Sequence, residues 1–329
     1  MLDKKVLKRI YKELKTPYKY GAVIKFEGKW TDSPVVFKYG DAFYMSYVAI
    51  DKTEKKGYET RIAKSEDLLH WQDLFRVLEK PSDWDRAQTG GYAQMQDIRF
   101  QGTNELLTVD EKYIFSYLGG NTEGYEGDPL SIGLAVTTDI LDPAAYQKEP
   151  LPILSGLDTD ARRGETLTLY KANMFFDEAK VTGYPYVCAY NAKDQTNRES
   201  IFLAVSEDGL HWKRHLREAI IPVWECPDSV LINGDPQIVK IDDLYVMLYF
   251  VCDGDRAYNT FAVSYDLKTW TKWDGKPLMQ SEKAWENVYA HKQWTIKENG
   301  VVYQYYCAVN DQGERFIALA SSKKRRLEK

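Results

Sequence analysis

Short runs of apolar and β-branched residues alternate with polar turns along most of the chain. Residues 32–47 contain a short β-type run, a polar turn and a longer aromatic run, and residues 235–250 repeat this design. Such a pattern is typical of a β-hairpin. Three looser relatives of these two hairpins follow at residues 106–117, 173–190 and 291–308.

The motif Ser-x-Asp-x-x-x-Trp occurs three times, each time directly after a β-type run. Its copies are Ser65–Trp71, Ser206–Trp212 and Ser264–Trp270. Internal repetition of this kind indicates small sheets arranged in series, because one such sheet cannot bury both faces alone. Segments 130–138 and 315–322 occupy the place of a third strand. Five hairpins with five following strands predict an all-β fold, a five-bladed β-propeller, with residues 21–329 as the catalytic domain.

The first twenty residues differ from the rest and form a predicted N-terminal helical extension. Val6, Ile10, Tyr11 and Leu14 recur at helical spacing among lysines, which predicts a short amphipathic helix. Its apolar side must pack either on the propeller rim or on a second subunit. A homodimer through this helix is therefore one of two alternatives.

Charge and composition narrow the partners. The net charge is −5, and the one basic run is the tail Lys323–Arg326, so no nucleic acid partner is expected. The start has no apolar signal-peptide core, and no run approaches 18 apolar residues, so no membrane segment is expected. If Met1 is the native start, the protein is cytoplasmic; if a signal peptide has been removed, it is periplasmic or secreted.

The four cysteines do not indicate a metal site or a disulfide scaffold. They lie apart, without Cys-x-x-Cys spacing, at Cys188, Cys226, Cys252 and Cys307. Three fall inside expected strands, where a buried thiol is the plain interpretation. Neither a metal nor a cofactor is expected from this pattern.

The propeller turns the repeat into a site prediction, because the innermost strands of all blades meet at one axis. The residues at or just before these strands are Asp32 in blade one; Asp97, Arg99 and Glu105 in blade two; Glu165 and Lys171 in blade three; Asp235 in blade four; and His291 in blade five. The Gly-rich stretch 119–128 reads as a long loop that offers Tyr125 and Glu126 to the same pocket. A cluster of carboxylates, a lysine and a histidine is expected there.

Two carboxylates across a small gap suit glycosidic cleavage. One is kept protonated, by burial or by a neighbouring negative charge, and gives its proton to the leaving oxygen. The other stays ionised and activates water or attacks the anomeric carbon. Asparagine, glutamine and aromatic residues in the expected loops suit sugar hydroxyls and sugar faces. A carbohydrate substrate is therefore expected.

The blade openings at Asp32-Ser-Pro and Gly234-Asp-Pro, and the Ala-Val-Ser-x-Asp-x-x-x-Trp closings at Ala204 and Ala262, resemble those of five-bladed propeller glycoside hydrolases. These include glycoside hydrolase families 43, 32, 117 and 130. The resemblance to family 43 implies Asp32 as general base, Glu165 as the nearest blade-three acid and Asp235 in the place of the general acid.

The sequence also departs from family 43, because blade four opens with Asp instead of Glu and the aligned place in blade three is Lys171. The string Trp224–Asp228 resembles the acid-bearing Glu-Cys motif of family 32, which makes Glu225 a further candidate acid. By resemblance, His291 contacts substrate or supports a hydrated ion, so a calcium ion on the axis near His291 is a further expectation. Lys171 could bind an anionic sugar, or phosphate as in a family 130 phosphorylase.

The leading hypothesis is an exo-acting, inverting glycoside hydrolase that removes a terminal pentose or hexose by carboxylate acid/base catalysis. A catalytically silent carbohydrate-binding propeller and a glycoside phosphorylase are the alternatives.

Overall fold

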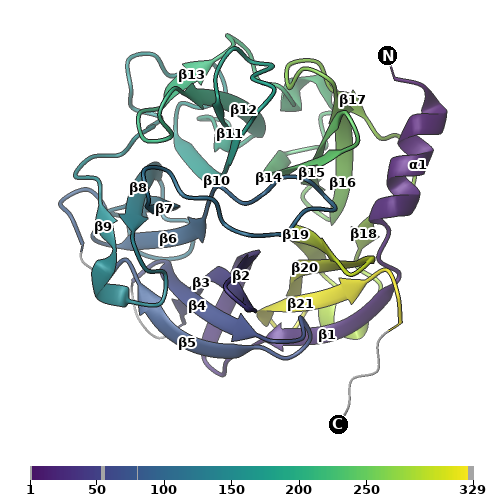
Figure 1. Cartoon of the computed structure of the whole chain (residues 1–329), viewed down its shortest axis with the longest axis horizontal. Helices are drawn as coiled ribbons and strands as arrows, with labels where there is room; N and C mark the ends of the chain where they lie inside the picture. The colour runs from purple at the N-terminus through teal and green to yellow at the C-terminus, as the bar shows by residue number, and fades with distance from the viewer. Residues whose placement is uncertain (1, 53–55, 80, 325–329) are drawn as a thin grey trace.

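Five small antiparallel sheets surround a central axis in the computed structural model of the chain, which describes residues 2–52, 56–79 and 81–324 (Figure 1). The expected five-bladed propeller is confirmed. Arg325 and Arg326 of the expected basic tail lie outside the described residues.

Each blade is built from consecutive strands that run outwards from the axis. They are β2 (Lys29–Tyr39), β3 (Ala42–Asp51), β4 (Glu59–Ser65) and β5 (Gln72–Val77) in blade one; β6 (Gln88–Ala93), β7 (Tyr113–Gly120), β8 (Ser131–Thr137) and β9 (Gln147–Lys148) in blade two; β10 (Thr168–Phe176), β11 (Tyr186–Lys193), β12 (Glu199–Ser206) and β13 (Lys213–His215) in blade three; β14 (Ile232–Ile241), β15 (Leu244–Cys252), β16 (Ala257–Ser264), β17 (Thr271–Lys272) and β18 (Met279–Gln280) in blade four; and β19 (Tyr289–Glu298), β20 (Val301–Val309), β21 (Arg315–Ser321) and β1 (Tyr18–Ile24) in blade five. Three 3₁₀ turns complete the secondary structure: Pro143–Ala145, Val223–Glu225 and Ala284–Glu286.

The chain closes the ring by placing its N-terminal strand on the outside of the last blade. β1 pairs antiparallel with β21, the third strand of blade five. Lys19 of β1 forms an ion pair with Glu286, which is fully buried and also accepts a hydrogen bond from Tyr306. The boundary expected at residue 20 falls inside β1, so the helical extension ends before Tyr18.

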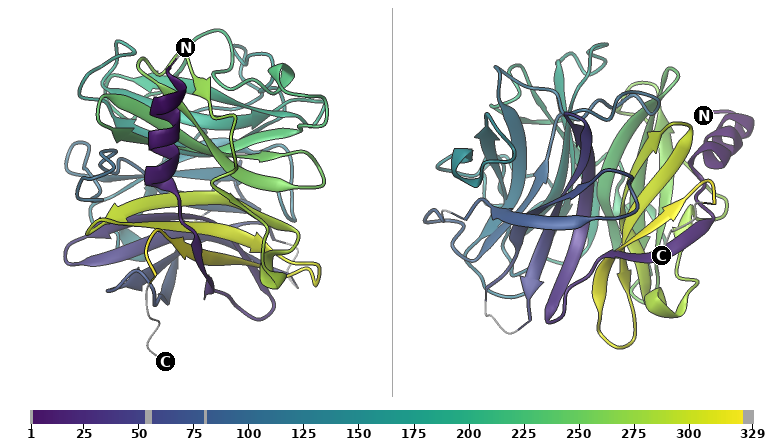
Figure 2. Two further views of the ribbon diagram at one scale, coloured as in Figure 1. Left: turned by 90° about the vertical axis from the view of Figure 1, so that its right-hand side faces the viewer. Right: turned by 60° about the horizontal axis from the view of Figure 1, so that its bottom comes forward.

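The N-terminal extension contains one helix, α1 (Lys4–Leu14), whose Asp3 side chain caps the backbone N–H of Lys5. Its buried side, formed by Leu7, Ile10 and Leu14, belongs to the apolar cluster of blade four, and Figure 2 shows the helix along the outside of the propeller. The helix thus covers its apolar side on its own chain. The exchange of this helix in a homodimer stays a prediction. None of the helices in the described ranges is long and apolar enough to cross a membrane.

The repeated Ser-x-Asp-x-x-x-Trp motif forms the turn after the third strand of its blade. In the first copy, Asp67 accepts hydrogen bonds from the backbone N–H groups of Leu69 and His70 and also contacts the His70 ring. The second copy repeats these contacts around Asp208. The motif therefore specifies turn geometry.

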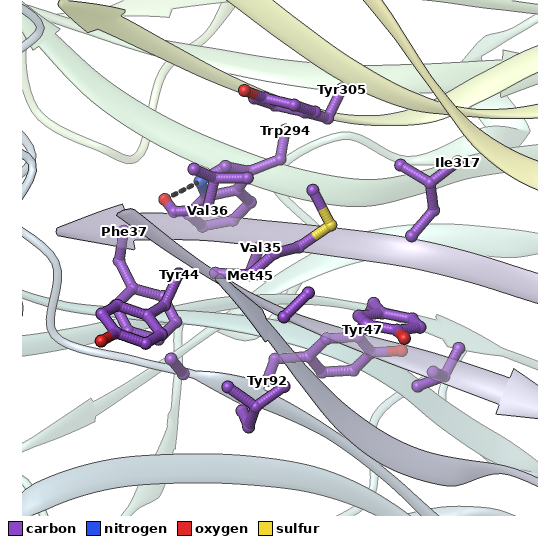
Figure 3. Packing of buried hydrophobic residues seen from close by; sticks show 14 of the residues in the cluster. Val35, Val36, Phe37, Tyr44, Met45, Tyr47, Tyr92, Trp294, Tyr305 and Ile317 are labelled. Atoms are coloured by element: carbon purple, nitrogen blue, oxygen red, sulfur yellow. Dashed lines mark hydrogen bonds between the residues drawn. The ribbon is translucent and has the colours of Figure 1, made fainter. Parts of the chain in front are cut away.

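Neighbouring blades are joined near the axis by side chains that bind the backbone of the next blade. The contacts are Ser46 Oγ to Ala93 N–H, Gln94 to Met174 N–H and Ala172 C=O, Asn173 Oδ1 to Ile238 N–H, Gln237 to both backbone groups of Thr295, and Trp294 Nε1 to Val36 C=O. Figure 3 shows the last of these, with Trp294 of blade five packed on β2 of blade one. Together they run once around the ring.

Blade two departs from the expectation. The inner strand was expected in the hairpin at residues 106–117, but it is β6, within the stretch that was expected to join blades one and two. Two glycines weaken the β-type pattern of β6, and the packing requires them. A Cβ on Gly91 would lie 2.6 Å from Leu78 Cδ1, so a larger residue would clash with blade one.

Replacing Lys19 by methionine should lower the free energy of unfolding by about 3–5 kcal/mol, because it leaves the carboxylate of Glu286 buried without its cation. Urea unfolding followed by tryptophan fluorescence measures the change. The matched control is Lys25→Met, which removes the exposed 2.8 Å ion pair with Glu314 and should cost less than about 1 kcal/mol. Equal effects of the two variants would contradict closure by Lys19.

Candidate active site

One end of the propeller axis carries a cavity of about 190 Å³. It is bordered by the starts of inner and third strands, the ends of second strands and the loop between β7 and β8. The lining residues are Tyr125, Glu126, Tyr170, Asn191, Glu199, Ile232, Asp235, Phe250, Cys252, Ala257, Tyr289, His291, Lys292 and Arg315. Three acidic and two basic side chains thus meet in a space small enough for one sugar residue.

The other end of the axis is covered by the segment between β6 and β7. In Figure 1 this blue segment crosses the centre of the ring. Its backbone meets the far ends of the inner strands, with bridges from Glu105 to Lys38 and from Arg99 to Lys240. Asp97 binds Arg99 at 2.8 Å on this side. The prediction that Asp97, Arg99 and Glu105 bind substrate at the mouth was therefore wrong, because it rested on the misplaced inner strand.

A β-bulge interrupts the inner strand of four blades beside the cavity. The pairing skips residues 33–34, 170–171, 235–236 and 292–293. Ser33, Asp235 and Lys292 hold the first bulge position with φ between 46° and 52°, and Tyr170 holds it in blade three. A bulge re-aims side chains and is common beside active sites. Asp235 therefore corresponds to Ser33, one residue beyond the expected match with Asp32.

Asp32 lies beneath the cavity as the centre of a dense network. Its side chain is 2% exposed, and its Oδ2 accepts hydrogen bonds from Arg315 Nη1 at 2.8 Å, Tyr125 Oη at 3.1 Å and Lys292 Nζ at 3.2 Å. Burial opposes ionisation, but the charges of Lys292 and Arg315 hold the pKa of Asp32 well below its usual value. With its acceptor sites occupied, Asp32 is suited to orienting two cations.

Glu126 reaches the cavity, as expected, from the loop between β7 and β8. Its Oε1 accepts a hydrogen bond from Lys292 Nζ at 3.0 Å. Burial again opposes ionisation, yet the charge and hydrogen bond of Lys292 lower the pKa of Glu126 below its usual value. Glu126 is therefore an ionised carboxylate that faces the cavity.

Glu199 is the first residue of the third strand in blade three. A parallel bridge to Ile232 and a 2.8 Å hydrogen bond from its N–H to Leu231 C=O draw this strand end towards the axis. Asn191 Nδ2 donates to Glu199 Oε2 at 2.7 Å. Burial, helped by the negative charge of Glu126, raises the pKa of Glu199 to about 8. Glu199 therefore carries a proton at neutral pH.

Asp235 lines the cavity, as expected, between two polar neighbours. Its Oδ2 accepts a hydrogen bond from Ser33 Oγ at 3.1 Å and lies 3.9 Å from Lys171 Nζ. Burial raises the pKa of Asp235. Lys171 lies under the cavity, donates to Pro34 C=O at 3.1 Å, and has its pKa lowered by burial to about 8. Lys171 therefore holds the floor of the site and does not line the cavity.

His291 lines the cavity beside cations. Its Nδ1 lies 3.3 Å from Cys307 C=O, and burial together with Arg315 and Lys292 lowers its pKa to about 3. A neutral imidazole next to two positive charges does not fit a calcium ion. Across the described ranges, no three His, Cys, Asp or Glu side chains cluster in a way that could hold a metal.

Two of the expected acids lie away from the cavity. Glu165 is fully buried in blade three, where Arg162 and Arg214 neutralise it and Tyr190 donates to it. Glu225 is exposed in the turn Val223–Glu225. Neither lines the cavity, so the expected convergence of Glu165 with Asp32 and Asp235 was wrong. The reason is that each precedes its inner strand by several residues.

Sequence reasoning missed Glu199, Lys292 and Arg315. Glu199 and Arg315 open the third strands of their blades, which start at the same end of the axis as the inner strands. Strands alternate in direction within a blade, so this rule was available. Lys292 could have been found by aligning Pro34 with Pro236, which marks the bulge position. As arranged, the cavity pairs a protonated carboxyl with an ionised one, and such a pair can move a proton across a bond held between them.

A family model described as "beta-1,4-mannooligosaccharide phosphorylase", of glycoside hydrolase 130, matches residues 107–326. A solved structure described as a complex of BT0996 and RGII is 38% identical, covers 100% of this sequence and 98% of its own, and has a TM-score of 0.93. A comparison with curated proteins finds no match.

More distant structures share the fold. A thermostable family-43 glycoside hydrolase is 15% identical, with 94% of this chain and 98% of that chain covered at a TM-score of 0.66. A structure from work on "the GH130 family of mannoside phosphorylases", which "contains glycoside hydrolases", is 13% identical, with 94% and 95% covered at a TM-score of 0.61. With the match over residues 107–326, this protein belongs to the glycoside hydrolase 130 family and is a glycoside-processing enzyme.

Proposed function

We propose that this protein is a glycoside hydrolase in which Glu199 is the general acid and Glu126 the ionised partner. One observation carries the proposal: two glutamates that line the same small cavity have their pKa values moved in opposite directions. Such divergence assigns acid and base roles in carboxylate pairs.

The proton starts on Glu199. As the glycosidic bond breaks, Glu199 transfers this proton to the leaving oxygen, while Asn191 holds its carboxyl group in place. Glu126 is ionised and acts on the opposite side of the sugar, where it takes a proton from the attacking water. This single displacement inverts the anomeric carbon. Lys292, held by both Asp32 and Glu126, keeps Glu126 ionised.

The size of the cavity supports exo action on a terminal sugar. Its volume of about 190 Å³ is below the ~300–1,000 Å³ of pockets for drug-sized ligands. One pentose or hexose residue suits such a space. The 38% identical protein whose structure is described as a complex with RGII supports a carbohydrate substrate here too.

Phosphorolysis is the second candidate, favoured by the family description and by the two cations in the cavity. A phosphate would need donors that are free to bind it. Lys292 and Arg315 already bind Asp32, and Lys292 also binds Glu126. This pairing favours water over phosphate as the acceptor.

Replacing Glu199 by glutamine should lower kcat/KM about 1,000-fold on oligosaccharides, because the leaving oxygen then receives no proton. The loss should shrink to about 10-fold or less on a 2,4-dinitrophenyl glycoside of the same sugar, whose leaving group needs little protonation. The control is Glu225→Gln, which alters an exposed acid outside the cavity and should keep wild-type rates. Equal losses on both substrates would remove Glu199 from the acid role and favour Asp235.

The pH profile of kcat/KM should fall near pH 8. Glu199 must be protonated to act, and its pKa is raised from the usual 4.5 to about 8, so activity is lost as pH rises through about 8. The folded state also keeps this proton longer than the unfolded chain. The free energy of unfolding should therefore decrease between pH 4.5 and 8, and Glu199→Gln should remove this decrease. A descending limb below pH 6 would contradict the assignment.

Hydrolysis should proceed at its full rate in phosphate-free buffer. A panel of 4-nitrophenyl pentosides and hexosides identifies the sugar, and proton NMR of the first product should show the inverted anomer. A requirement for orthophosphate, with release of a sugar 1-phosphate, would identify a phosphorylase. Sugar binding without turnover of any substrate would identify a catalytically silent propeller.

A further inference from the structure

Tyr170 is a cavity residue with no role in the proton transfers described above. It lies in β10 at the first bulge position of blade three, the place that Ser33, Asp235 and Lys292 hold in their blades. Its side chain lines the cavity together with Glu126 and Glu199 and is only 5% exposed. The repeat of the fold thus delivers it to the same space as the reacting groups.

The hydroxyl group of Tyr170 is the unusual feature. It has no hydrogen-bond partner among the described residues. The other three bulge residues are engaged: Ser33 donates to Asp235, and Lys292 donates to Asp32 and Glu126. A buried hydroxyl without a partner costs stability, and such groups are rare in native proteins. This cost points to a partner that arrives from outside the chain.

The surroundings of Tyr170 define what that partner accepts. Burial and the negative charges of Glu126 and Glu199 raise the pKa of Tyr170, so the phenol keeps its proton and remains a donor. The ring is held in place, with Lys193 Nζ 5.5 Å from its centroid. A rigid, neutral donor beside two carboxylates suits a sugar hydroxyl, which accepts a hydrogen bond without adding charge.

We propose that Tyr170 binds the sugar whose glycosidic bond is broken, by donating its hydroxyl proton to one hydroxyl group of that sugar. The proposal rests on the proposed function, because the two carboxylates beside Tyr170 flank the reacting bond there. It makes Tyr170 a residue that selects the sugar. A sugar that lacks the matching hydroxyl leaves the phenol unpaired, and a site built in this way rejects such an analogue strongly.

The test is Tyr170→Phe, assayed on the 4-nitrophenyl glycoside that the wild-type enzyme cleaves fastest. The value of kcat/KM should fall about 10-fold to 100-fold, and by the same factor for the 2,4-dinitrophenyl glycoside of that sugar. The descending pH limb should stay in place, because Glu199 is unaltered. The melting temperature should rise, because the variant removes an unpaired buried hydroxyl.

The matched control is Tyr305→Phe. Tyr305 is equally buried, but it donates to Leu68 C=O at 2.6 Å, far from the cavity lining. This variant should melt at a lower temperature and keep wild-type kinetics. Opposite signs of the two stability changes, with activity lost only in Tyr170→Phe, support the proposal.

Two outcomes would overturn the proposal. One is a kcat/KM for Tyr170→Phe within about twofold of wild type. The other is a loss confined to poor leaving groups, which would place Tyr170 with Glu199 and not on the sugar. Calorimetric binding of the free monosaccharide, weakened in Tyr170→Phe, tests the same contact without turnover. If the wild-type enzyme requires phosphate, hydrolysis fails as its function, while this binding measurement still decides the role of Tyr170.

Discussion

The inner strands of this propeller each present one backbone edge to the axis, where water is largely excluded, so their polar groups must find partners in the neighbouring blade. Gln94, Asn173 and Gln237 provide such partners by binding the next inner strand, and Trp294 joins blade five back to blade one. These contacts set the spacing and register of the blades. The cavity depends on them, because its residues come from different blades and meet only if the ring is closed.

The β-bulges use this rigid ring to build the site. Each bulge turns one side chain of an inner strand towards the axis, and Ser33, Asp235 and Lys292 reach one another in this way. Burial then acts on the charges that are brought together. Where a cation is in contact, as at Glu126, the carboxylate stays ionised; where only an amide is in contact, as at Glu199, it keeps its proton. One cavity therefore holds both protonation states.

Much of the fold could be predicted because the repeat is written in local patterns. The Ser-x-Asp-x-x-x-Trp turns and the hairpins at Asp32 and Asp235 located blades one, three and four. Blade two was misplaced because Gly90 and Gly91 hide its inner strand, and their role in packing against blade one is visible only in three dimensions. Asp235, Glu126 and His291 were brought to the cavity as expected. Glu199 and Arg315 were missed because only inner strands had been considered.

The sequence by itself determined the number of blades, the amphipathic helix and the kind of side chain available for chemistry, since these follow from periodicity and short motifs. Only the tertiary structure decided which carboxylates face the cavity. Asp32 and Glu165 are the clearest cases: both are acids near an inner strand, yet cations from distant positions, Arg315 for Asp32 and Arg214 for Glu165, engage them fully. A carboxylate's protonation and reach depend on burial and on partners far away in the sequence, and no local pattern encodes either of them.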